Sequence, residues 1–394
     1  MSAFWKRRRL GPLAAFFAGL VVAVLVGLGI WAFSAPGTKQ AADKAPTPSF
    51  SPAPVPESAA PTAEVGGTKI VCPAVSVRVR DGAGLQAALT AARPGAVIGL
   101  ADGIYSGRFT ATARASAAAP IYLCGGRGAV LDGGGITRGY VLHLSGAAYW
   151  RLSGFTIRNG QKGVVADHTT ATIIDNLDVG HLGDEGIHLR SASTYNIVEN
   201  NNVHNTGLYS AKFGEGIYVG SAVKNWCAYA ACQPDRSDHN TIADNTISHT
   251  TAENLDIKEG TTAGTVTGNH FDGAGMTSAD SLVDVKGNGW TIHANTATAS
   301  APNTLTEGYE THQIVKGWGT GNAFTANTGT LRISGYAIQL NPINTNQIGC
   351  DNQLTGPAQG LANTPCTTSP TIDSSIFLAA PGTSTGKHKH HHDS

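Results

Sequence analysis

A short repeated phrase is the feature of this sequence that most constrains its fold. The phrase has the form apolar-x-x-Asn, and its successive copies begin 24, 45, 24, 26 and 32 residues apart. The six copies are Ile173–Asn176, Ile197–Asn200, Ile242–Asn245, Val266–Asn269, Ile292–Asn295 and Phe324–Asn327. A recurring period of this length indicates stacked structural units, so we expect coils of about 24 residues that are interrupted by insertions.

The asparagine of each phrase has a physical reason to recur. Asn tolerates the left-handed backbone of a tight turn better than most residues, and its side-chain amide can hydrogen-bond to a neighbouring chain. We therefore expect each Asn to occupy a left-handed turn and to bond to the Asn of the next coil.

A second set of short strands lies between these phrases and alternates strictly between apolar and polar residues. They are residues 186–189, 216–219, 254–257, 282–285 and 337–340. The alternation predicts an outward ladder of His188, Tyr218, Asp256, Asp284 and Gln339, followed by a second ladder of Arg190, Gly220, Lys258 and Lys286.

These patterns predict an all-β fold, a right-handed parallel β-helix, or solenoid. Residues 83–93 place Leu85, Ala88 and Leu89 on one helical face, which predicts a short N-terminal capping helix over the open end of the coils. A β-propeller would show a longer repeat, and a β-sandwich would show no fixed period.

The N-terminal part of the chain predicts export. Lys6 to Arg9 precede an uncharged, largely apolar run of 22 residues, from Pro12 to Phe33, which is long enough to span a bilayer. A cleaved signal peptide is the alternative, and both place the rest of the chain outside the cytoplasm. We expect a basic end and membrane segment at 1–35, a Pro/Ala/Ser-rich linker at 36–67, the β-helix at 68–380 and a disordered His-rich tail at 381–394.

Composition limits the partners. Charged residues make up only 14% of the chain, and 27 Lys and Arg balance 27 Asp and Glu, so no net field favours nucleic acid. We expect a monomer that contacts the membrane only through its N-terminal segment.

An even number of cysteines in an exported chain predicts disulfides, and proximity in sequence favours Cys72 with Cys124, Cys227 with Cys232, and Cys350 with Cys366.

Two intervals of the repeat are enlarged, residues 204–238 and 298–312. Insertions in a solenoid become loops on one side, which is often the binding face. His188, Arg190, Tyr218 and Trp226 are therefore the predicted substrate-binding residues.

Charged residues recur along the predicted ladders. Asp256-Ile257-Lys258 and Asp284-Val285-Lys286 are 28 residues apart, so Asp should lie over Asp and Lys over Lys. Either the four groups form a solvated patch of salt bridges, or the aspartates gather a cation while the lysines face an anionic substrate. Glu185, Glu215 and Glu253 recur just before the strands, and they either cap turns or add to this site.

The start of the coils resembles many pectate-lyase-like β-helix proteins, and Glu253 to Lys258, with Lys286 one coil later, resembles a family of β-helix polysaccharide lyases. That family includes chondroitinase B and alginate lyases. The resemblance implies that Glu253 binds calcium, that Lys258 removes the proton beside a uronic carboxylate, and that Lys286 stands where an assisting Arg is expected. Thr251 occupies the place of a second acidic ligand.

Together these observations predict a lyase that cleaves an acidic polysaccharide by β-elimination. The candidate catalytic residues are Lys258, Lys286, Asp256 and Asp284, and the candidate calcium ligands are Glu253, Glu215 and Asp256. We expect Lys286 to lower the pKa of Lys258. The alternatives are a glycoside hydrolase that uses Asp256 with Asp284, or Asp184 with Glu253, and a non-catalytic polysaccharide-binding surface protein.

Overall fold

The structure is a computed structural model that describes residues 70–368 and 370. The chain divides into two units, 1–58 and 59–394, and the described residues all belong to the second. The predicted basic end, membrane segment, linker and His-rich tail lie outside the described residues.

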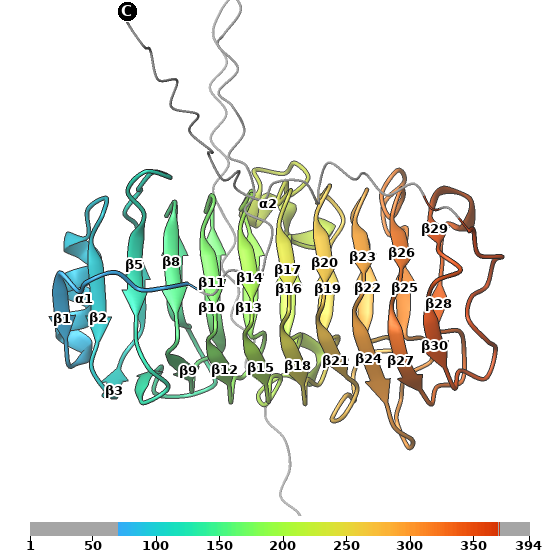
Figure 1. Ribbon diagram of the computed structural model, residues 1–394, viewed down its shortest axis with the longest axis horizontal. Helices are drawn as coiled ribbons and strands as arrows, with labels where there is room; N and C mark the ends of the chain where they lie inside the picture. Colours follow the sequence, from blue (N-terminus) through green and yellow to red (C-terminus); the bar gives the residue numbers. More distant parts are fainter. Residues whose placement is uncertain (1–69, 369, 371–394) are drawn as a thin grey trace, which may run out of the picture. The chain divides into compact units, whose positions relative to one another are not determined.

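The described residues wind into coils that contribute strands to three parallel sheets, which run along one axis (Figure 1). Sheet 1 contains β1 (Val77–Val79), β2 (Val97–Leu100), β5 (Ile121–Cys124), β8 (Trp150–Ser153), β11 (Ile173–Asp175), β14 (Ile197–Glu199), β17 (Thr241–Ala243), β20 (Thr265–Thr267), β23 (Thr291–His293), β26 (Ala323–Thr325) and β29 (Gln347–Ile348).

Sheet 2 contains β4 (Phe109–Ala111), β7 (Tyr140–Ser145), β10 (Lys162–Asp167), β13 (Ile187–Arg190), β16 (Ile217–Val219), β19 (Leu255–Ile257), β22 (Val283–Val285), β25 (Tyr309–Thr311) and β28 (Ile338–Gln339). Sheet 3 contains β3 (Gly103–Ser106), β6 (Ala129–Asp132), β9 (Thr156–Arg158), β12 (Asp178–Gly180), β15 (Asn202–His204), β18 (Thr246–Ser248), β21 (His270–Asp272), β24 (Thr296–Ala299), β27 (Thr328–Leu331) and β30 (Gln353–Thr355). This topology confirms the expected parallel β-helix.

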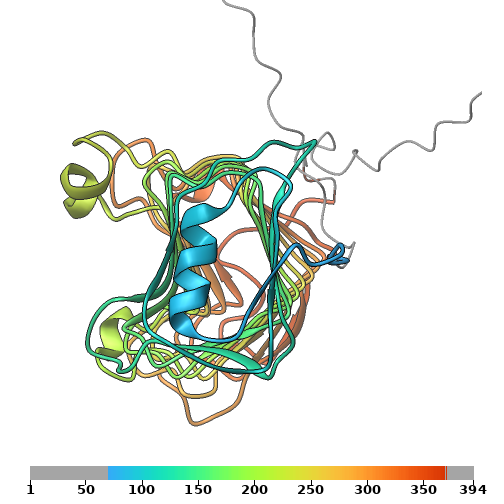
Figure 2. The same cartoon turned by 90° about the vertical axis from the view of Figure 1, so that its left-hand side faces the viewer.

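Among residues 70–368, helices are few and short. They are α1 (Gly82–Ala91), α2 (Trp226–Tyr229) and the 3-10 turns η1 (Ala211–Phe213), η2 (Val223–Asn225) and η3 (Ile343–Thr345). The side chain of Asp81 accepts a hydrogen bond from the Gly84 amide at the start of α1, while Leu85 and Leu89 are buried. In the view along the axis, α1 lies across one end of the coils (Figure 2). No helix among residues 70–368 is both long and apolar enough to cross a membrane.

The core is a set of apolar ladders inside the coils. Along sheet 2, Ile187, Ile217, Leu255 and Val283 are partners in neighbouring strands, and all four are fully buried. Each such side chain contributes roughly 1.5–3 kcal/mol through burial. Because inward and outward residues alternate, this core fixes which polar side chains face outward.

The asparagines occupy two adjacent positions, so the prediction that one residue does both jobs is wrong. Asn176 and Asn200 have left-handed backbones, with φ of 51° and 55°. In the coil that follows, Asp244 takes the left-handed position and Asn245 the buried one after it. The buried ladder consists of Asn201, Asn245, Asn269, Asn295, Asn327 and Asn352. The two positions separate because the left-handed residue faces solvent, whereas an amide that bridges coils must point inward.

All three predicted disulfides are present: Cys72–Cys124, Cys227–Cys232 and Cys350–Cys366. The bond between Cys227 and Cys232 closes the turn that contains α2.

Candidate functional site

A pocket of about 510 Å³ lies on the outward face of sheet 2, over β10, β13, β16 and β19. Its walls come from η1, before β16, and from η2 and α2, after β16. In Figure 2 the segment that contains η1 and the segment that contains η2 and α2 project on the same side of the coils. Residues 204–238, which are predicted to border the binding face, contribute lining residues to this pocket, whereas residues 298–312 contribute none.

Tyr218 and Lys258 lie side by side in this pocket. Tyr218 is paired with Asp256 on the next strand, and the Lys258 Nζ atom is 5.0 Å from the centroid of the Tyr218 ring. The His188 ring packs edge-on against the other side of Tyr218, with 4.3 Å between centroids. The Tyr218 side chain is held by these neighbours.

The charged ladder forms one buried chain of ion pairs. Asp256 contacts both Lys258 and Lys286, the latter at 3.0 Å from Nζ to Oδ1, and Lys286 also contacts Asp284. Asp lies directly over Asp, as predicted. The salt-bridge interpretation is therefore right about the pairing, but these groups are buried rather than solvated: Asp256 is only 1% exposed.

The prediction that Lys286 lowers the pKa of Lys258 is wrong. Burial acts to lower the pKa of Lys258, but the negative charge of Asp256 outweighs it and raises this pKa well above its usual value. The pKa of Lys286 is raised in the same way. The sequence pattern missed this effect because Asp256 lies between the two ammonium groups and attracts both.

Glu215, Glu253 and Asp256 come from neighbouring coils and bring carboxylate oxygens within 4.8 Å of one another. Burial and neighbouring carboxylates raise the pKa of Glu215 well above its usual value, and burial and Asp256 raise that of Glu253 to about 7. The Glu215 Oε2 atom is buried without a hydrogen bond. Calcium prefers such oxygen ligands, and Glu215 and Glu253 have no ion-pair partner among the described residues, whereas both carboxylate oxygens of Asp256 already contact lysines. The two glutamates are therefore the members of the cluster that fit this ion best.

Thr251 does not join this cluster. Its hydroxyl donates to the Ala211 carbonyl at 2.9 Å and packs between the two Gly-containing segments of the first insertion. Glu215, from the preceding coil, supplies the additional acidic group instead.

Arg190 anchors one wall of the pocket. It donates to Asp167 at 2.6 Å and to the Tyr140 hydroxyl at 3.0 Å, and its guanidinium lies 4.0 Å from the centroid of the Tyr229 ring. Trp226 does not line the pocket, because its indole N–H donates to the Ser221 carbonyl. Tyr229 is the aromatic residue of α2 that does. Sequence reasoning missed it because both residues lie in α2, and nothing in the sequence shows which one faces inward.

His188 is buried, and burial lowers its pKa well below the usual value, so it is neutral. Its Nε2 atom lies 2.9 Å from the Gly220 carbonyl oxygen. Glu185 accepts a hydrogen bond from Lys162 at 2.6 Å. Lys162 adds a cation to the pocket, and sequence reasoning missed it because the strand that carries Lys162 lacks the repeated phrase. Asp184 also lines the pocket and accepts a hydrogen bond from Gln161, whereas Asp284 lies outside the pocket-lining set.

The fold and this pocket place the chain in the class of right-handed parallel β-helix proteins: residues 140–329 match the family model described as "Right handed beta helix region". An alginate lyase from Paenibacillus sp. str. FPU-7 is 34% identical, with a TM-score of 0.69, and the match covers 73% of this chain and 99% of that one. The chain therefore belongs to the same family of pectate-lyase-like β-helix proteins.

Two other solved structures are similar to the chain at lower identity. The enzymatically active domain of tailspike protein 2 from bacteriophage CBA120 is 10% identical, with a TM-score of 0.51 over 74% of this chain and 46% of that one. The pectate lyase Pel9A is 15% identical, with a TM-score of 0.45 over 75% and 79%. No curated protein sequence matches the chain.

Proposed function

We propose that this protein is an extracytoplasmic polysaccharide lyase that cleaves an acidic, uronic-acid-containing polymer by β-elimination. The observation that carries this proposal is the adjacent Tyr218 and Lys258 pair in a pocket lined with charged groups. Kinship with an alginate lyase supports it, and three disulfides support an oxidising, extracytoplasmic location.

The pocket suits an anionic sugar chain. Lys162, Lys212 and Lys224 line it together with Arg190 and Lys258, and they are spread over the floor and both walls. Tyr229 offers an aromatic surface on the wall that Arg190 anchors. Cations attract the carboxylates of a uronate polymer, while aromatic faces pack against sugar rings.

β-Elimination removes the proton at C5 of a uronate, forms the C4–C5 double bond and expels the oxygen at C4. In our proposal the Lys258 amine takes the C5 proton, and the Tyr218 hydroxyl gives a proton to the leaving oxygen. The products are a Lys258 ammonium and a Tyr218 phenolate, and transfer of the proton back from Lys258 to Tyr218, directly or through water, restores the starting forms. Because Asp256 favours the ammonium form of Lys258 in the free protein, turnover should rise with pH.

Calcium is the implied cofactor, and Glu215, Glu253 and Asp256 would hold it. The ion would neutralise the uronate carboxylate and so make the C5 proton more acidic. Lys286 and Asp284 act as positioning residues in this proposal, because they reach Lys258 only through Asp256.

The test is to incubate the protein with a panel of uronic-acid polymers, with and without calcium, and to follow the ultraviolet absorbance of the unsaturated product. Tyr218→Phe and Lys258→Met should each lower turnover by at least about 100-fold. Lys316→Met, at an exposed residue outside the pocket, is the matched control and should leave turnover unchanged. New reducing ends without an unsaturated product would contradict the lyase and favour a hydrolase, and binding without cleavage would favour a non-catalytic surface protein.

A further inference from the structure

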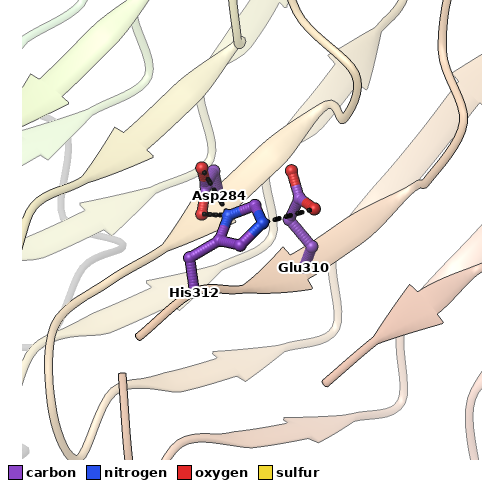
Figure 3. Close-up of side chains that lie close together, drawn as sticks. All are labelled: Asp284, Glu310 and His312. Atoms are coloured by element: carbon purple, nitrogen blue, oxygen red, sulfur yellow. Dashed lines mark hydrogen bonds and ion pairs between the residues drawn. The ribbon is translucent and has the colours of Figure 1, made fainter. Parts of the chain in front are cut away.

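A second group of ligand-type side chains lies beside the pocket, on β22 and β25. Glu310 lies on β25 and His312 is the first residue after that strand, and Asp284 is the direct partner of Glu310 on the neighbouring strand. Figure 3 shows the His312 ring between the two carboxylates. One ligand atom from each residue lies within 4.8 Å of the others. Neither Glu310 nor His312 lines the pocket.

Asp284 orients the imidazole of His312. The His312 Nδ1 atom lies 3.1 Å from both carboxylate oxygens of Asp284, which fits an Nδ1–H group that donates to them. When the imidazole is neutral, the lone pair of its Nε2 atom points towards Glu310. Its distance to Glu310 Oε2 is 3.5 Å, longer than a good hydrogen bond. Carboxylates commonly orient metal-binding histidines through the other ring nitrogen in this way.

Glu310 supplies an independent sign of a missing cation. Its side chain is only 4% exposed, and its buried Oε1 atom has the Ser281 hydroxyl close by, in a contact too poorly aligned to satisfy it fully. A buried carboxylate oxygen without a well-aligned partner is costly, and a bound cation would remove that cost. The His312 side chain is 32% exposed, which leaves a route from solvent to the Nε2 atom.

We propose that His312 Nε2 and Glu310 bind a divalent transition-metal ion such as Zn²⁺, with Asp284 orienting the imidazole and water completing the coordination. An imidazole nitrogen beside a carboxylate favours zinc over calcium, whereas the all-carboxylate group of Glu215, Glu253 and Asp256 has the opposite preference. The ion would lie at the end of β25, next to the chain of ion pairs. This proposal does not depend on the proposed lyase activity.

Zinc titration by calorimetry tests this proposal in the full chain with the four tail histidines, His388, His390, His391 and His392, replaced by Ser. We expect saturable zinc binding that Glu310→Gln and His312→Gln each weaken by at least tenfold. His270→Gln, on the outward side of β21, is the matched control and should change nothing. Circular dichroism checks that each variant is folded.

Anomalous diffraction from zinc-soaked crystals of the protein with Glu310 and His312 unchanged then locates the ion directly. A peak between His312 Nε2 and Glu310 is the expected result. No saturable zinc binding, or a zinc peak only at other residues, would overturn the proposal and leave His312 as a proton-bearing bridge between two carboxylates.

Discussion

Replacing Asn269 by Ala should destabilise the β-helix strongly, because this residue joins three coils. Its amide nitrogen donates to the Ile242 carbonyl at 2.8 Å and to Asn295 Oδ1 at 3.0 Å. Its Oδ1 atom accepts from the backbone N–H of Asn245 at 3.0 Å and from the Asn245 amide at 2.9 Å. The side chain is completely buried.

The expected cost follows from these bonds. Alanine leaves the Asn245 backbone N–H buried without its acceptor, at about 1–3 kcal/mol, and removes further amide bonds at about 0.5–1.5 kcal/mol each. The sum is a loss of about 3–5 kcal/mol in the free energy of unfolding. Asn202→Ala is the matched control, since its one side-chain bond, to Asp178 at 2.7 Å, lies on the outer face of sheet 3. It should cost about 1 kcal/mol or less.

Urea unfolding followed by circular dichroism measures both costs, and hydrogen exchange of the Asn245 amide reports the lost acceptor locally. We expect that amide to exchange faster in Asn269→Ala than in the Asn202→Ala variant. Equal unfolding costs for the two variants, or an unchanged exchange rate at Asn245, would refute the idea that the buried ladder holds adjacent coils together.

Three further predictions concern charge and the pocket. A hydrogen bond to Asp178 raises the pKa of His204. His204→Gln should therefore destabilise the protein by up to about 1 kcal/mol below pH 6.5, the ordinary pKa, and the difference should disappear as pH rises through the folded pKa, as urea unfolding across pH would show. Tyr229→Ala should raise KM for polymer without lowering kcat comparably, whereas Trp226→Phe should change KM less. Chelation of calcium should abolish turnover, and Glu215→Gln should weaken calcium binding measured by calorimetry.

Much of the site could be predicted because a solenoid converts sequence period into spatial neighbourhood. Asp256 and Asp284 lie one repeat apart, and the parallel register places one directly over the other. The same reasoning predicts that Glu215, Glu253 and Asp256 lie together, and their carboxylate oxygens lie within 4.8 Å of one another. Where the sequence departs from the repeated phrase, as at Lys162, this reasoning had no signal and missed a cation of the pocket.

The sequence by itself determined the parallel coils, the outward ladders and the disulfide partners, because these depend on period, alternation and proximity along the chain. The tertiary structure decided which of Trp226 and Tyr229 faces the pocket, and that the left-handed turn and the asparagine ladder use adjacent residues. It also reversed the expected pKa shift of Lys258. The direction of a pKa shift depends on which charge is nearer in a buried environment, and sequence spacing does not give that distance.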